Sequence, residues 1–300
     1  MRAAALGLAL ALCGPAAAAT CGEFDATLEA RLARDPTTLE VNALLFEAAR
    51  AGCAEALPRL FLAGASRLAR DRDGDTALGL ASRAGRASVV EALIVGADER
   101  RQLDLADAHG ATPLMLAIHS GRSAIARRLI EAGAAVDAAD RQGETALSEA
   151  AFAPDEEIGL ALLARGAPPD TQDRTGNRPL CYAAARGALK LAAALIDAGV
   201  AVDARCGGET TALMWAAGHP DLTRTELAVA TTKLLLARGA AIDARDDRGR
   251  SALMIAAALN RFETARTLLA AGADRGLRDK GGASAADLAA TPEMRALAAP

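Results

Sequence analysis

Asp107-Ala108-His109-Gly110-Ala111-Thr112-Pro113-Leu114 opens the best copy of a block that returns about every 33 positions along the chain. The same spacing of turn and helix residues recurs at starts near 71, 140, 173 and 246. Asp followed three positions later by Gly favours a turn, because Asp bonds its own backbone and Gly accepts positive φ. Thr before Pro is typical of a helix start, since Thr caps a free amide and Pro has none to leave unpaired.

Each block continues with two helical segments. The first contains Leu-x-x-Ala-Ala, whose small residues allow close neighbours. The second carries apolar residues at i, i+1, i+4 and i+5, as in Val89, Val90, Leu93 and Ile94. We expect glycine to end these second helices in the left-handed conformation at Gly64, Gly96, Gly133, Gly166, Gly199, Gly239 and Gly272. One unit cannot bury its own apolar surface, so such units stack in a line and bury it for each other.

The block resembles the ankyrin repeat, whose signature is Thr-Pro-Leu-His-x-Ala within a period of about 33 residues. The resemblance covers residues 40–300 and implies an all-α solenoid of stacked helix-turn-helix repeats with short β-hairpin-like connecting loops. The signature His is absent, and its positions hold Gly79, Met115, Ser148, Cys181, Met214 and Met254. In the family this His bonds between neighbouring loops, so we expect those cross-links to be missing or substituted here.

The repeat register divides the chain into successive parts. Residues 1–19 have the pattern of a signal peptide, 20–40 of a leading helix, and 41–70 of an N-terminal capping repeat. Residues 71–278 hold five full repeats and one with an insertion near 218–226, with starts near 71, 107, 140, 173, 206 and 246. Residues 279–300 form a C-terminal capping repeat with a truncated second helix, because terminal repeats are atypical.

Two connections are longer than the rest. The closing Gly follows the motif Leu by 19 residues in four repeats, but by 26 from Leu213 to Gly239, which leaves seven residues extra. We expect these residues to lengthen the connection between helices around 218–221. A second long link runs from Asp98 to Ala106. Insertions in a solenoid map to surface loops, where they either serve binding or drift without function.

The N-terminus predicts export from the cytoplasm. Arg2 gives a short charged start, an apolar core follows from Ala3 to Leu12, and small residues precede an expected cut near Ala19. The apolar core is too short for a membrane span, and charged turns interrupt every later segment. The Ala-, Arg- and Gly-rich composition resembles that of bacteria with GC-rich genomes, so export implies a periplasmic or secreted protein.

The mature chain keeps four cysteines, an even number that favours disulfides in an exported protein. Four cysteines allow three pairings, and the sequence alone does not choose among them. The family register places Cys181 at the signature His position, which points at the next loop, and Cys206 within that loop. On this resemblance we pair Cys181 with Cys206 and Cys21 with Cys53, each bridge stabilising by about 3 kcal/mol. The alternative is four buried thiols that pack as small apolar groups.

The sequence shows no constellation of catalytic or metal-binding residues. The three His lack metal-ligand spacing, and neither Cys-x-x-Cys nor Gly-x-Ser-x-Gly occurs. The acidic run Asp155–Glu157 suits a helix N-terminus without a catalytic role. With 34 basic and 38 acidic residues, the chain has no block of like charge for nucleic acid or an anionic membrane. We therefore expect no enzyme, no cofactor, no metal and no nucleic-acid partner.

The candidate functional feature is a surface. The resemblance implies a concave face of hairpin tips and first helices that binds proteins. Tyr182 and Trp215, the only Tyr and Trp, take the same position in adjacent repeats and should stand side by side, whereas we expect Phe152 to pack. Tyr, Trp and Arg are frequent interface anchors, although rings at this position equally suit packing between repeats. The candidate protein-binding residues are Arg72, Asp73, His109, Arg141, Gln142, Arg174, Tyr182, Trp215, His219, Asp247 and Arg248.

These features predict a monomeric, exported, non-catalytic module that captures another protein on its concave face. A periplasmic immunity protein, or an inhibitor of a toxin or enzyme, is one alternative. An accessory role in oxidative-stress defence is another, because some exported bacterial proteins of this family are linked to peroxide defence. An enzyme with a site assembled across repeats is a further alternative.

Overall fold

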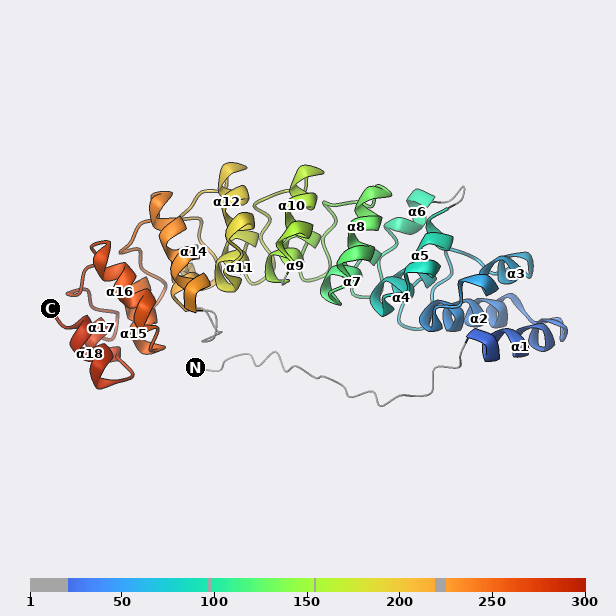
Figure 1. Ribbon diagram of the computed structural model, residues 1–300, viewed down its shortest axis with the longest axis horizontal. Coiled ribbons are helices and arrows are strands. Elements are labelled where there is room, and N and C mark those ends of the chain that lie inside the picture. The colour runs from blue at the N-terminus through green and yellow to red at the C-terminus, as the bar shows by residue number, and fades with distance from the viewer. Residues whose placement is uncertain (1–20, 96–98, 154, 219–224) are drawn as a thin grey trace.

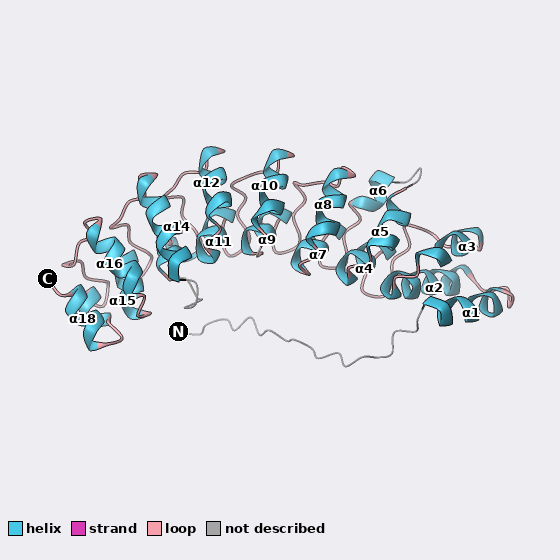
Figure 2. Ribbon diagram, viewed as in Figure 1, coloured by secondary structure: helices cyan, strands magenta, loops and turns pink. Residues whose placement is uncertain are grey.

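The computed structural model describes residues 21–95, 99–153, 155–218 and 225–300. Within them, paired helices follow one another in file and build an all-α solenoid that bends gently (Figure 1). Figure 2 shows helices and loops without a strand in this part of the chain, where only isolated β-bridges join Ala139 to Thr145 and Cys206 to Thr210. The predicted signal peptide with its cut near Ala19, the closing Gly96, and His219 lie outside the described residues.

Two layers of helices make up the stack. The first helices of the repeats are α4 (Ala77–Ala84), α7 (Pro113–His119), α9 (Ala146–Phe152), α11 (Pro179–Arg186), α13 (Ala212–Ala217) and α15 (Ala252–Ala258). The second helices are α5 (Ala87–Ile94), α8 (Ser123–Glu131), α10 (Glu156–Ala164), α12 (Leu189–Asp197), α14 (Thr225–Ala237) and α16 (Phe262–Ala270). The first helices run along the inner side of the bend (Figure 1). We call the side formed by these helices and the hairpin tips the inner face.

The ends of the stack use other helices. The N-terminal part consists of α1 (Cys21–Leu32), α2 (Thr38–Ala51), the 3-10 helix η1 (Ala54–Ala56) and α3 (Leu57–Leu62). The C-terminal part consists of α17 (Ala285–Leu288) and α18 (Pro292–Ala298). The second helix of this last repeat, α18, has 7 residues and is shorter than the second helices before it, and its first helix α17 has only 4.

The helix starts follow from the block itself. The side chains of Thr76, Thr112 and Thr145 accept hydrogen bonds from backbone amides three residues later, so they cap α4, α7 and α9. Each cap satisfies an amide that the helix leaves free, which is worth about 1 kcal/mol. The predicted Thr caps are confirmed at these repeats, whereas Thr211 makes no such bond and its buried hydroxyl has no partner.

The core lies between the two helix layers and runs along the whole stack. The motif leucine of each first helix is at most 1 % exposed, and these residues are Leu78, Leu114, Leu147, Leu180, Leu213 and Leu253. The second helices bury leucines against them, as Leu129 and Leu195 show. Full burial of one leucine contributes about 2 kcal/mol, so the stack is held together by neighbours burying each other's apolar surface.

The two long connections are not plain loops. Residues of the first link form the short helix α6 (Glu99–Leu103), where Gln102 is buried and donates a hydrogen bond to the carbonyl of Leu93. In the repeat with the insertion, α14 has 13 residues, whereas the neighbouring second helix α12 has 9. Part of the extra length therefore extends a helix, and the expected longer connection around 218–221 falls mainly outside the described residues.

Arginines substitute for the missing signature His. Arg70 donates to the carbonyl of Gly74 in its own turn and to that of Ala106 in the next repeat. Arg205 does the same toward Glu209 at 2.6 Å and Arg245 at 2.9 Å. Arg245 in turn donates to the carbonyls of Gly249 and Arg278. These side chains join successive turns, so the cross-links between repeats are substituted and not lost.

Candidate functional site

Aspartates at the start of the turns, except the one that begins at Cys206, hold the hairpin tips in place. Asp140 Oδ1 accepts the amides of Gln142 at 2.7 Å and Glu144 at 2.9 Å. The aspartates that accept two amides in the same way elsewhere are Asp71, Asp107, Asp173, Asp246 and Asp279. Each of these carboxylates is thus bonded within its own turn, and the two residues between Asp and Gly form the tip.

The tips form one continuous edge. The Arg141 amide donates to the His109 carbonyl at 2.9 Å, and the Arg174 amide donates to the Gln142 carbonyl at 2.8 Å. The sequence-predicted residues that lie on this edge are exposed, and they are Arg72, Asp73, His109, Arg141, Gln142, Arg174, Asp247 and Arg248. Within the described ranges, no ion pair or hydrogen bond is made by the guanidinium groups of Arg141 and Arg174.

Three aromatic rings line up across adjacent first helices. The ring centroids of Tyr182 and Trp215 are 6.0 Å apart, and those of Phe152 and Tyr182 are 6.1 Å apart, both edge to face. Tyr182 and Trp215 stand side by side, as the repeat register predicts. Phe152 is 52 % exposed, so the expectation that it packs in the core was wrong. Edge-to-face pairs of this kind contribute about 1 kcal/mol beyond their buried area.

Hydrogen bonds fix the polar ends of two of these rings. The Tyr182 hydroxyl donates to Asp173 Oδ2 at 2.5 Å, and Trp215 Nε1 donates to Thr210 Oγ1 at 2.8 Å. Burial and the Asp173 carboxylate raise the pKa of Tyr182. Burial opposes ionisation of Asp173, but hydrogen bonds from Thr175 and Tyr182 outweigh it and hold the pKa of Asp173 below its usual range. The rings are therefore held in one orientation while part of each stays exposed on the inner face.

Two glutamates lie beside the rings. Glu149 takes the helix position that Tyr182 holds one repeat later, and its carboxylate lies 3.2 Å from His119 Nδ1. Glu144 precedes the capping Thr145 and is half-buried. Burial, followed by the charges of Glu149, Asp140 and Asp173, raises the pKa of Glu144 to about 7. The Glu144 carboxyl is thus fully ionised only above neutral pH.

The cysteines join in the two pairs that the repeat register implied. The Cα atoms of Cys21 and Cys53 are 5.2 Å apart, and those of Cys181 and Cys206 are 6.7 Å apart, with bonded sulfurs. The first bridge ties α1 to the end of α2. The second lies beneath the aromatic row, because Cys181 precedes Tyr182 and Cys206 begins the turn that contains Thr210. Cys53, Cys181 and Cys206 are buried.

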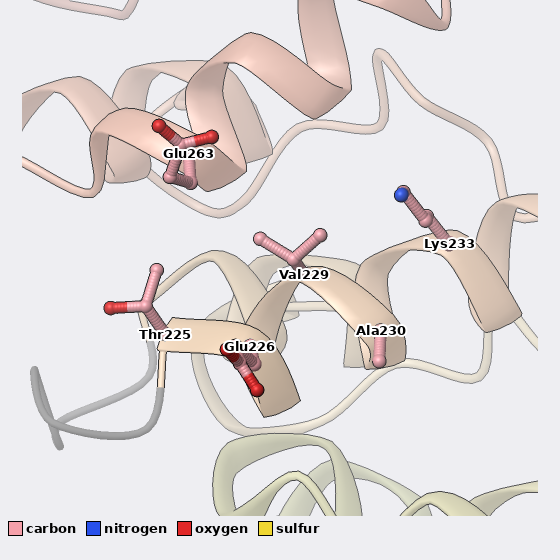
Figure 3. Close-up of a pocket in the computed structure, with 6 residues that line it drawn as sticks. All are labelled: Thr225, Glu226, Val229, Ala230, Lys233 and Glu263. Atoms are coloured by element: carbon pink, nitrogen blue, oxygen red, sulfur yellow. The ribbon is translucent and has the colours of Figure 1, made fainter.

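A shallow pocket occurs in the other helix layer. It lies between α14 and α16 and is lined by Thr225, Glu226, Val229, Ala230, Lys233 and Glu263 (Figure 3). Val229 points toward the α16 side, while the charged groups of Glu226 and Lys233 do not converge on a common point (Figure 3). In the described part of the chain, no group of three or more His, Cys, Asp or Glu could hold a metal ion. There too, no helix combines the length and apolar character needed to cross a membrane.

The neighbouring rings of Tyr182 and Trp215 could be predicted from the repeat register, whereas Glu144, Glu149 and Arg186 were not among the predicted site residues. The guanidinium of Arg186 lies 5.0 Å from the centroid of the Phe152 ring, in the geometry of a cation–π contact. Glu149 could have been found, because it shares the register position of Tyr182 and Trp215. Glu144 and Arg186 gave no such signal, since their importance depends on neighbours from other repeats.

Comparison with known proteins gives one consistent result. A family model described as ankyrin repeats in three copies matches residues 44–141, 100–173 and 147–228. A model of the single ankyrin repeat matches residues 248–280. No curated protein matches the chain significantly.

Proposed function

The chain belongs to the ankyrin repeat family, and from that premise we propose that it captures a partner protein on its inner face without catalysis. Repeats of this family form protein–protein interaction modules. The observation that carries the proposal is the row of Phe152, Tyr182 and Trp215 across three successive first helices. Tyr and Trp are enriched among residues that dominate binding energy, and here they remain partly exposed.

Rigid display is the mechanism that we propose for this face. Asp173 and Thr210 already fix the two polar ring ends, and backbone bonds between tips fix the edge beside them. Immobilising a side chain at an interface costs about 1 kcal/mol, so a face ordered beforehand avoids much of that loss on binding. Exposed arginines of the tips, such as Arg141 and Arg174, would then contact carboxylates at the edge of the interface.

We also propose that the protein works outside the cytoplasm as a monomer. The two bonded cysteine pairs indicate an oxidising compartment. The N-terminal pattern of charged, apolar and small residues supports export to the periplasm or secretion, with cleavage near Ala19. We further propose that the chain divides into a leading helix, capping repeats at the two ends and full repeats between them.

Affinity capture with the mature chain tests the binding proposal. The variant Phe152→Ala/Trp215→Ala should lose the captured protein, because it removes two of the three rings in the row on the inner face, one exposed and one half-buried. Phe262→Ala is the matched control, since Phe262 is an exposed ring on α16 in the other layer. If both variants retain the partner, the inner face is not the contact surface. Tight equimolar capture of an exported toxin or enzyme would identify the inhibitor or immunity case.

A further inference from the structure

Two carboxylates and two rings meet at the centre of the inner face. Glu149 and Phe152 lie one helical turn apart on α9, and the Tyr182 ring of α11 contacts Phe152 edge to face. Glu144 lies in the turn before α9, close enough for its charge to act on the Tyr182 hydroxyl. We call these residues, Glu144, Glu149, Phe152 and Tyr182, the central floor.

The negative charge of the central floor is poorly compensated. The Glu144 carboxyl shares a hydrogen bond with Glu149 and is close enough to Asp140 and Asp173 to be affected by their charges. Asp140 and Asp173 are engaged by turn amides, and Asp173 also accepts the Tyr182 hydroxyl. Two basic side chains reach the central floor, since His119 lies beside Glu149 and the Arg186 guanidinium lies over the Phe152 ring. Among the described residues, no lysine or arginine forms an ion pair with Glu144 or Glu149.

The rings of the central floor suit a cation. The quadrupole of an aromatic ring attracts a guanidinium or ammonium group placed over its face. Arg186 already places its guanidinium over the Phe152 ring, and among the described residues it forms no ion pair with a carboxylate. A guanidinium therefore already lies over the Phe152 ring, and an arginine of a partner would take the place of Arg186 there. Neither of the two glutamates beside the ring is ion-paired with an arginine in the described part of the chain.

We propose that the central floor recognises an arginine or lysine side chain of a basic segment in the partner protein. The inference rests on the proposed function and adds the chemistry of the partner. A planar guanidinium can bond carboxylate oxygens in pairs and stack on a ring at the same time, which fits this combination of groups. An acidic segment would instead be repelled by the negative charges of Glu144 and Glu149.

Binding of a short oligoarginine peptide to the mature chain tests the inference. Trp215 is the only tryptophan and its ring contacts that of Tyr182, so we expect its fluorescence to change when the central floor is occupied. We expect the peptide to bind the wild type at physiological ionic strength and at about pH 8, where Glu144 is ionised, and Glu144→Gln/Glu149→Gln to weaken that binding about tenfold. Glu226→Gln/Glu263→Gln is the matched control, because it removes the same charge from the other helix layer.

The outcomes separate this inference from the function on which it rests. Tenfold weaker binding in the central-floor variant, with the control unchanged, supports it. Absence of binding, or equal losses in both double variants, overturns it, because the attraction would then come from net charge alone. Neither result changes the conclusion drawn from the capture experiment with Phe152→Ala/Trp215→Ala, which tests the proposed function separately. A partner captured through those rings by an acidic or uncharged segment would also overturn the inference while leaving the proposed function intact.

Discussion

At the scale of single residues, Glu144 is the side chain whose ionisation most clearly destabilises the folded protein. Its burial and the neighbouring carboxylates raise its pKa to about 7, well above that of a glutamate in an unfolded chain. Between about pH 5 and about pH 7 the folded protein holds a proton that the unfolded chain has lost. The free energy of unfolding therefore falls as the pH rises through this window, and the loss is complete above it.

Replacement of Glu144 by glutamine should remove this penalty. At pH 8 we expect Glu144→Gln to be about 1 to 2 kcal/mol more stable than the wild type, after allowance for solvent screening of a half-buried group. At pH 5, where Glu144 is protonated, the two proteins should unfold alike. Urea denaturation at both pH values measures this, with the exposed Glu131→Gln as control. An equal effect at both pH values would show that the charge of Glu144 is not the cause.

The hydrogen bond between Tyr182 and Asp173 gives a second residue-scale prediction. Tyr182→Phe keeps the ring in the aromatic row but removes the hydroxyl that lies 2.5 Å from Asp173 Oδ2. A hydrogen bond to a charged group contributes about 2 kcal/mol, and Asp173 retains its bonds from Thr175 and the turn amides, so we expect a loss near 1 kcal/mol. Chemical denaturation measures it, and unchanged stability would mean that water replaces the hydroxyl without loss.

Some residue roles follow from the block and others do not. The Asp turns and Thr caps could be predicted, because each acts on an amide a few residues away in the same repeat. The cross-linking arginines could not, because a long flexible side chain reaches a carbonyl some 30 to 40 positions along the chain. Arg70, Arg205 and Arg245 nevertheless share one register position, directly before the turn, which is the signal that links them.

At the scale of elements, the turn that starts at residue 206 departs from the others. It has Cys206 where the other turns have Asp, so no carboxylate accepts its amides. It also has Glu209 at a φ of 59°, a position that glycine takes elsewhere. The bridge from Cys206 to Cys181 therefore holds a turn whose own sequence is the weakest in the stack. Through Thr210 the same turn also supports the ring of Trp215.

Exchange of this bridge for an aspartate turn tests that account. We expect Cys181→Ala/Cys206→Ala to lose about 3 kcal/mol under oxidising conditions, since the bridge closes a loop of 25 residues. Cys181→Ala/Cys206→Asp should regain about 1 kcal/mol, because the carboxylate can again accept turn amides. Denaturation of both variants measures the difference. If the Asp variant were no more stable than the Ala variant, the disulfide would not be compensating for the missing hydrogen bonds between turn amides and an aspartate.

The repeat register predicts which helices the repeats contain but not the lengths of all of them. The register of the core leucines and closing glycines predicted the two helices of each repeat, because these residues recur at fixed spacing. It did not predict α6, nor that α14 would lengthen to 13 residues, since neither segment repeats anywhere else in the chain. The short α17 could not be predicted either, because the block gives no sign that the first helix of this repeat has only 4 residues.

At the scale of the whole molecule, stability is a sum over neighbours. Each repeat packs on the one before and the one after, and the N-terminal helix α1 is held by the Cys21–Cys53 bridge and by ion pairs of Arg59 with Asp25 and Glu29. In such a stack, loss of one end removes the partner of only the adjacent repeat. The centre of the inner face lies several repeats from either end, so its rings and carboxylates should be insulated from events at the ends.

Removal of residues 279–300 tests this insulation. The truncation takes away α17 and α18, whose Ala285, Met294 and Ala298 are buried against the last full repeat. We expect amide exchange to accelerate in α15 and α16, because their apolar residues lose a covering layer, while α9 and α11 keep their protection. The truncated chain should also still bind oligoarginine as the full chain does. Equal loss of protection in α9 and α15 would mean that the solenoid unfolds as one cooperative unit, so that each end supports the central floor after all.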